Sequence, residues 1–284
     1  MIVWTLLAGI AQAQIAPECR GLDRPEDYDE QVQQDFLANY PALATTFSPI
    51  HGPIPHAPGR AAVGVELAVI PPLSCRRRYV LEWSKTEDTN RMPVAPRIRG
   101  SVALPEVAGF VPYVGLGYVP PIPVAGTRSV ILSIEAGIGR DFGAVEAGAR
   151  FHATSFKLVA DIATAFAPHH PDLDDFYVAS TLGVDLLVGV PLEPLTPYLA
   201  VGVTDVSTFF YVADTGTVPN NLHPYFGPVF SLGVDGLLGS FRWGAELYGA
   251  PGGHVRPDPT AETLPGFGRY GHLYTARLRV GWEL

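Results

Sequence analysis

Apolar and polar residues alternate with a period of two over most of the chain, from residue 59 to the C-terminus. The last nine residues show this most clearly, because Arg277 and Arg279 alternate with large apolar residues. Successive side chains of a strand point to opposite faces, so the segment is predicted to be a strand with one apolar and one charged face. Such a strand suits a barrel with lipid outside and a polar lumen inside, and it also suits a soluble β-sandwich.

The same alternation recurs upstream and predicts a series of strands joined by turns. It covers 130–138, 147–151, 182–190, 230–238 and 241–247, and further strands are expected near 60–70, 76–84, 96–105, 109–119, 156–166 and 195–212. Together with the C-terminal strand these segments make about 12 strands, within a range of roughly 10 to 14. An even number is expected, because an up-and-down barrel with both chain ends on one side requires it.

The first 13 residues, MIVWTLLAGIAQA, are apolar and end in the small-x-small pattern Ala11-Gln12-Ala13. This pattern predicts a cleaved export signal, although the basic start is missing, so the true start lies upstream or the signal is weak. The alternative is a buried N-terminal strand of a soluble protein. The segment is too short to span a bilayer as a helix, which needs about 20 residues. A membrane location would therefore require a barrel.

Two sequence features resemble a known class of protein. The alternating strand that ends at Leu284 resembles the terminal strand of bacterial outer-membrane barrels, although those usually end in Phe. Pro112-Tyr113, Pro197-Tyr198 and Pro224-Tyr225 resemble the strand starts of small outer-membrane barrels, which would place the tyrosines in an aromatic girdle. The resemblance covers roughly residues 59–284 and implies a class without an activity. It also implies that outer-membrane lipid and the barrel assembly machinery are partners.

The expected fold is therefore all-β: a transmembrane antiparallel up-and-down barrel in the bacterial outer membrane, with a short N-terminal helix. We divide the chain into a signal peptide (1–13), a helical segment with a Pro-rich connector (14–58) and the barrel (59–284). The assembly signal is expected on the apolar face of the last strand: Ala276, Leu278, Val280, Trp282 and Leu284.

The segment before the barrel has helical spacing. Asp23 with Glu26 matches a capping box, and Pro25 suits an early helical position. The apolar positions that follow share one face: Tyr28, Val32, Phe36, Leu37 and Tyr40. The stretch 49–58 is Pro-rich and predicts an extended connector. Three placements are open for the helix: the periplasmic rim, the lumen, or a loosely ordered leader that only tethers the barrel.

Loop lengths predict the orientation of the barrel. If the last strand descends to the periplasm, Gly239-Ser240 is a periplasmic turn, and residues 251–271 and about 213–223 are external loops. Two cysteines, Cys19 and Cys75, permit one disulfide in an exported chain or remain free thiols. Their spacing is not that of a metal site.

Charge and composition narrow the choice of function. The net charge of −9 and the absence of a dominant basic patch exclude a nucleic-acid partner. Charged residues of both signs are expected inside the barrel: Glu66, Arg97, Arg99, Glu135, Glu146, Arg150, Asp161, Asp185, Asp235, Arg242, Glu246, Arg277, Arg279 and Glu283. They form either a salt-bridged packing network or the lining of a polar pore.

Candidate chemistry is sparse. The pair His152 and Ser155 superficially resembles the His-x-Ser of membrane-embedded esterases, but Phe156 and Lys157 stand where Asn is expected, and His152 is predicted to end a strand. A metal site in an external loop, with His169-His170-Pro171-Asp172, Asp174 and Asp175 as its ligands, is a second weak signal. We expect neither catalysis, nor a metal, nor a cofactor.

Three functions follow, in decreasing order of expectation. The first is passive or selective transport of a small solute or an apolar compound. The second is a structural or adhesive barrel whose external loops bind a partner without transport. The third is a membrane-embedded esterase. The sequence leaves the transported solute and the oligomeric state open, and it does not say whether the N-terminal helix blocks the lumen.

Overall fold

The computed structural model describes residues 15–26, 28–80, 82–87, 93–121, 123–124, 127–160, 174–213, 216, 218–222, 224–251 and 273–284. The expected signal peptide lies outside the described residues. The elements are η1 (Pro17–Cys19), α2 (Glu30–Ala44), β1 (Ala61–Val69), η2 (Cys75–Arg77), β2 (Tyr79–Val80), β3 (Lys85–Thr86), β4 (Val94–Ala103), β5 (Val111–Val119), β6 (Pro123–Val124), β7 (Thr127–Asp141), β8 (Glu146–Ala160), β9 (Asp175–Gly189), β10 (Leu195–Tyr211), β11 (Phe226–Leu238), β12 (Phe241–Ala250) and β13 (Leu273–Glu283).

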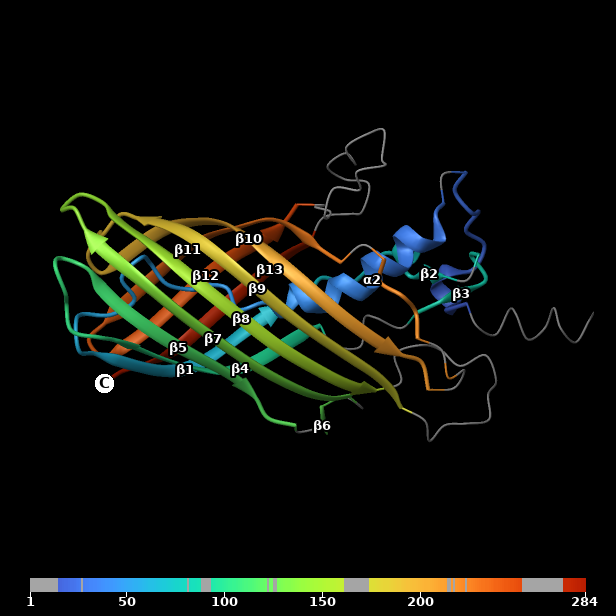
Figure 1. The fold of residues 1–284 in the computed structure, drawn as a ribbon, viewed down its shortest axis with the longest axis horizontal. Helices are drawn as coiled ribbons and strands as arrows, with labels where there is room; N and C mark the ends of the chain where they lie inside the picture. The colour runs from blue at the N-terminus through green and yellow to red at the C-terminus, as the bar shows by residue number, and fades with distance from the viewer. Residues whose placement is uncertain are drawn as a thin grey trace, which may run out of the picture.

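The strands form a closed antiparallel barrel (Figure 1). Their order is β5-β4-β1-β13-β12-β11-β10-β9-β8-β7, and pairing of β5 with β7 closes the ring. The short β6 only extends the edge of β7. The predicted all-β barrel is thus confirmed, with ten strands where about 12 were expected. No helix among the described residues is long and apolar enough to cross a membrane.

Two of the expected strands are corrected. Residues 76–84 do not join the barrel, because they lack alternation; instead they form η2 and part of a two-stranded sheet of β2 and β3. The segments 147–151 and 156–166 were expected as separate strands, but residues 146–160 form the single strand β8. Each correction lowers the number of barrel strands by one, from the expected 12 to ten.

The barrel has a short-turn end and a long-loop end. The C-terminus and the two-residue turn at Gly239, whose φ is +64°, lie at the short-turn end, as Figure 1 shows. The loop between β1 and β4, with η2, β2 and β3, lies at the other end beside α2. The strands are uneven: β7 to β10 have 15 to 17 residues, whereas the other six have 9 to 13.

Helix α2 begins later than the sequence pattern indicated. Its N-cap is Asp29, whose side chain accepts the Val32 N–H at 3.1 Å, so the expected capping box at Asp23 is wrong. The helix ends inside the barrel, where the Thr45 and Thr46 hydroxyls donate to carbonyls of its last turn. The placement at the rim of the short-turn end is therefore wrong, because α2 enters the lumen from the long-loop end.

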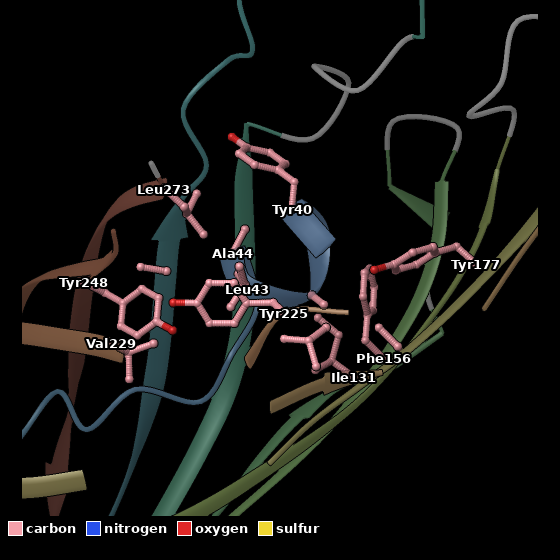
Figure 2. Close-up of a cluster of buried hydrophobic side chains, with 14 residues drawn as sticks. Tyr40, Leu43, Ala44, Ile131, Phe156, Tyr177, Tyr225, Val229, Tyr248 and Leu273 are labelled. Carbon is pink, nitrogen blue, oxygen red and sulfur yellow. The ribbon is translucent and has the colours of Figure 1, made fainter. Parts of the chain in front are cut away.

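An apolar cluster seals the helix into the mouth of the barrel (Figure 2). Tyr40 and Leu43 of α2 belong to this cluster, which includes Tyr225 just before β11 and inward residues of several strands: Ile131, Phe156, Tyr177, Val206, Val229, Tyr248 and Leu273. The Tyr177 hydroxyl also donates to the Ala38 carbonyl at 2.5 Å. The interior is therefore apolar near the long-loop end and polar below it.

The three Pro-Tyr tyrosines do not form the expected girdle. Tyr113, Tyr198 and Tyr225 are all nearly fully buried and point into the barrel. Each packs over a glycine of the barrel wall, as Tyr198 does over Gly233. The ring takes the space that a side chain at that glycine would need, so the motif fills the interior rather than facing lipid.

Candidate functional site: the lumen and its plug

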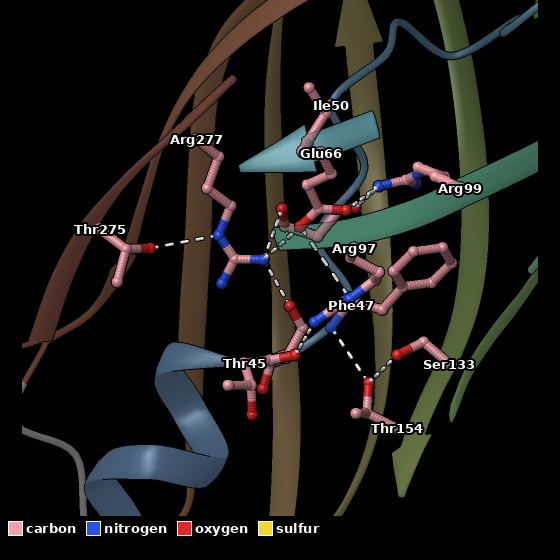
Figure 3. Close-up of polar contacts among 12 residues, drawn as sticks. Thr45, Phe47, Ile50, Glu66, Arg97, Arg99, Ser133, Thr154, Thr275 and Arg277 are labelled. Atoms are coloured by element: carbon pink, nitrogen blue, oxygen red, sulfur yellow. Dashed lines mark hydrogen bonds and ion pairs between the residues drawn. The ribbon is translucent and has the colours of Figure 1, made fainter. Parts of the chain in front are cut away.

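Residues 45–58, here named the plug, run from the end of α2 through the lumen to the short-turn end, where β1 begins (Figures 1 and 3). The inner wall leaves room for this segment through glycines. A Cβ at Gly117 would lie 2.8 Å from the Phe47 ring, and one at Gly189 would lie 2.7 Å from Pro53 Cδ. The plug therefore occupies space that ordinary side chains would otherwise fill.

Four arginines of the wall bind the carbonyl groups of the upper plug. Arg97 donates to Thr45, as Figure 3 shows. Arg277 donates to Thr46. Arg150 donates to Phe47, and Arg99 donates to Ser48 at 2.8 Å. The donors come from β4, β8 and β13, so the same short stretch of main chain is held from different sides of the barrel.

The same arginines hold three buried carboxylates. Glu66 lies 3.2 Å from Arg99, 3.7 Å from Arg277 and 3.9 Å from Arg97. Glu135 lies 2.9 Å from Arg99 and 2.7 Å from Arg150. Asp185 lies 2.6 Å from Arg150. These groups pair with one another as a packing network would.

The central network has four arginines against three carboxylates, and α2 supplies the missing acceptors. The last carbonyls of a helix have no partner within it and carry partial negative charge. Arg277 lies 3.3 Å from the Ala44 carbonyl and also reaches the Ser48 hydroxyl at 2.9 Å. The extra positive charge is thus directed at the C-terminus of α2 and the main chain that follows.

Phe47 lies at the centre of this network. Its ring centroid is 4.0 Å from the guanidinium carbon of Arg99, 5.3 Å from that of Arg97 and 5.8 Å from that of Arg150. Its amide donates to the Thr154 hydroxyl at 3.2 Å. A ring that contacts several guanidiniums at once combines cation–π attraction with exclusion of water from the ion pairs.

The lower plug is bound by a second set of groups. The Ile50 amide donates to Glu246 at 2.9 Å, and the Tyr198 hydroxyl donates to the same carboxylate oxygen at 2.7 Å. His51 lies 3.6 Å from Glu135 and packs edge-on against Tyr113. Every one of these partners is buried.

His56 joins the plug to a separate charge cluster at the short-turn end. Arg242 pairs with Asp235 and, at 2.9 Å, with Glu283. The same guanidinium donates to His56 Nδ1 at 2.9 Å, so Nδ1 accepts and the other ring nitrogen carries the proton. That nitrogen donates to the Ser101 hydroxyl at 2.7 Å. His56 is therefore neutral in this arrangement.

The remaining predicted charges are placed less centrally. Glu146 is half-buried near Gly52, and Arg279 is buried beside the network, with an Nη1 that has no hydrogen-bond partner among the described residues. Asp161 lies outside the described residues. The sequence prediction missed Phe47, His51 and His56. The sequence feature that could have pointed to them is a pair of histidines among apolar residues, in a Pro-rich stretch without hydrophobic periodicity.

The esterase pair is not assembled. His152 is buried on the inner face of β8, 3.5 Å from Asp185, whereas Ser155 is exposed on the outer face of the same strand. His152 lies in the middle of β8 and not at a strand end, which corrects its expected place. Asp175 lies at the start of β9 and accepts the Ala213 amide at 3.0 Å, while 161–173, with the paired histidines, lies outside the described residues.

At the long-loop end the N-terminal arm is fastened to the β1–β4 loop. We name this assembly the cap: η1 together with residues 75–80 and 82–87. Cys19 and Cys75 form a disulfide between the two parts. Tyr79 stacks on Trp83 with ring centroids 4.0 Å apart, and the Trp83 indole donates to the Leu22 carbonyl at 2.9 Å.

The outer surface of the strands is apolar. Outward side chains such as Leu186 and Trp282 are 64% and 58% exposed, while inward residues on the same strands are buried. The expected assembly-signal face of β13 is exposed, and its role in assembly stays a prediction. A closed antiparallel barrel that is apolar outside and charged inside is a transmembrane barrel of the outer-membrane type. The chain is therefore an outer-membrane β-barrel protein.

No protein-family model matches the chain, and no curated protein does. Among solved structures it is similar to the translocator domain of the autotransporter NalP from Neisseria meningitidis, at 11% identity and a TM-score of 0.44, over 80% of this chain and 89% of that one. It is also similar to the toluene transporter TodX of Pseudomonas putida, at 10% identity and a TM-score of 0.34, over 87% of this chain and 75% of that one. Ail, the attachment invasion locus protein of Yersinia pestis, is similar at 7% identity and a TM-score of 0.23, over 80% of this chain and all of that one. These likenesses carry no functional argument.

Proposed function

We propose that the protein is a closed outer-membrane barrel that presents its cap at the cell surface to bind a partner, and that it does not serve as an open pore. The observation that carries the proposal is the plug. Its carbonyls and amides are bound by buried charged groups of β4, β8, β12 and β13. Opening a passage would break those hydrogen bonds, and the loss of hydrogen bonds to buried charged groups is costly.

Conductance in planar bilayers tests the closed state. The wild-type protein is expected to give no current steps, whereas a variant that lacks residues 15–58 should give steps, because it loses the plug and α2 together. Steady wild-type conductance equal to that of the deletion variant would overturn the proposal. Transport of a small solute or an apolar compound would then be the better account.

Surface accessibility tests the role of the cap. Arg76 is exposed within the cap, and Arg60 is exposed at the short-turn end of the barrel. Each is replaced by Cys in turn in a background that lacks Cys19 and Cys75, and intact cells are treated with a membrane-impermeant thiol reagent. Labelling at position 76 alone is expected. Labelling at position 60 alone would reverse the orientation and remove the cap from the cell surface.

A further inference from the structure

The lipid-facing side of β7 to β10 changes character near the long-loop end. On β8, the outward positions from Ala147 to Ala153 are apolar, and Ser155 and Lys157 follow. Lys157 comes ten residues after Ala147. At about 3.3 Å per residue and a tilt of about 40°, that is roughly 25 Å above the lower edge of the apolar band. Lys157 therefore lies at the level where lipid headgroups begin.

Two cations lie side by side at this level. Arg128 on β7 pairs with Val159, and Lys157 on β8 pairs with Val130, so the two basic residues occupy diagonal outward positions on neighbouring strands. Diagonal positions have Cα atoms about 7–8 Å apart, which lets two long side chains converge on one anion. Both side chains are exposed.

Aromatic rings flank the pair on the side of β9 and β10. The Lys157 ammonium lies 4.9 Å from the centroid of the Phe176 ring, and Phe176 in turn contacts Phe209 edge-on at 6.4 Å. Tyr211 pairs with Phe176 across β9 and β10 and is 37% exposed. Aromatic residues of this kind mark the interface between the acyl chains and the headgroups.

Among the described residues, which include the exposed Asp174 beside β9, no carboxylate forms an ion pair with Arg128 or Lys157. Asp205 faces outward on β10, but it lies four residues below Phe209, which is in register with Val178 and so with Lys157. Four residues are about 13 Å along a strand, beyond the reach of a direct ion pair. The basic pair is therefore open to an anion from the membrane.

We propose that Arg128 and Lys157, with Phe176 beside them, form a binding site for the phosphate of a lipid headgroup in the outer leaflet. Two adjacent cations suit a phosphate, and the rings suit the glycerol or acyl region beneath it. The third outward cation of the described strands, Arg140, lies at the short-turn end over Phe110 and Phe142, at the level of the other leaflet.

The test uses the full-length folded protein in phosphatidylcholine nanodiscs that contain a small fraction of phosphatidic acid, with retained lipid counted by native mass spectrometry. The double variant Arg128→Gln with Lys157→Gln should retain less phosphatidic acid, by about fivefold for each charge removed. The matched control, Arg60→Gln with Arg76→Gln, removes the same charge elsewhere and should match the wild type. Arg128→Lys with Lys157→Arg should restore retention, and a heat-modifiable gel shift verifies folding of each variant.

Equal retention of phosphatidic acid by the wild type and the double glutamine variant would overturn the proposal. So would a wild-type protein that retains phosphatidic acid no better than phosphatidylcholine. Inorganic phosphate in millimolar excess separates the two sources of the anion. Lipid retention should persist in its presence, and complete displacement would mean that the site recognises free phosphate instead.

Discussion

The N-terminal arm is held in two places by opposite means. In the lumen, the plug is held by buried ion pairs that also bind its main chain, around Phe47 and Arg150. In the cap, outside the barrel, the arm is held by the Cys19–Cys75 disulfide and by the edge-on contact of the Tyr28 ring with Trp83. The difference follows from solvent: buried charges interact strongly and are costly to expose, whereas in water a covalent link and apolar contacts are more effective.

The lumen and the cap also differ in how much of the molecule depends on their contacts. Loss of a buried partner should affect the whole barrel, because the arginines that bind the plug also join β1, β4, β7, β8 and β9 through carboxylates. Loss of a cap contact should affect only the arm and the β1–β4 loop.

Arg150→Met is expected to have the largest effect. It would leave the buried Asp185 without its arginine, Glu135 with Arg99 as its remaining arginine, and the Phe47 carbonyl without its donor. The expected loss is about 3–5 kcal/mol in the free energy of unfolding, measured by urea titration in lipid vesicles. Arg140→Met, on the outer face, is the control and should change little. A loss below about 1 kcal/mol for Arg150→Met would contradict a network that stabilises the barrel.

Phe47→Ala should come next, with a loss of about 3 kcal/mol by the same measurement. The substitution removes a fully buried ring from among three guanidiniums but leaves every ion pair in place. Phe142→Ala is a matched control, because that ring is 61% exposed at the short-turn end. If the two alanine variants proved equally stable, the plug would not be part of the cooperative core.

Sequence pattern was sufficient for the wall of the barrel. On β13 the alternation placed Arg277 and Arg279 inside and Trp282 outside, as the structure has them. It failed on β8 for a physical reason. Below the mouth the interior is polar, but near the mouth it is apolar because it packs on α2, and the exterior there bears Ser155 and Lys157. The alternation therefore inverts within one strand, and the strand was divided in two.

The plug could not be predicted from sequence in the same way. An extended Pro-rich segment has no period, and its partners lie on strands far away in the chain, such as Glu246 for Ile50. The tyrosines of the Pro-Tyr motifs failed for a related reason. Alternation alone does not fix which face a tyrosine occupies at a strand's first residues, and the glycines over which the rings pack decide it.

Replacing Cys19 and Cys75 by Ser should have a smaller and more local effect. The link closes a long loop with a sequence separation of 56 residues, and its loss should destabilise the cap by about 2–4 kcal/mol. Limited trypsin digestion should then cut after Arg20, which is exposed, faster than in the oxidised wild type. The barrel should keep its heat-modifiable gel shift, because the ion pairs that hold the plug remain. A barrel that lost this shift would show that the cap and the wall unfold together.

Glu18→Gln should have the smallest effect, and this effect should depend on pH. A hydrogen bond from Arg78, 2.7 Å away, lowers the pKa of the Glu18 carboxyl below its usual 4.5. A lowered pKa in the folded state means that the contact stabilises the cap above pH 4.5 and is lost as the pH falls through the lower folded value. Solvent screens this exposed carboxylate, so the effect is small.

Hydrogen exchange of residues 75–80, corrected for intrinsic rates, measures this effect. The wild type should lose protection on acidification, and Glu18→Gln should change less. Glu106→Gln, in a turn at the short-turn end, should follow the wild type. If Glu18→Gln kept the full pH dependence, the acid sensitivity of the cap would have to come from another group.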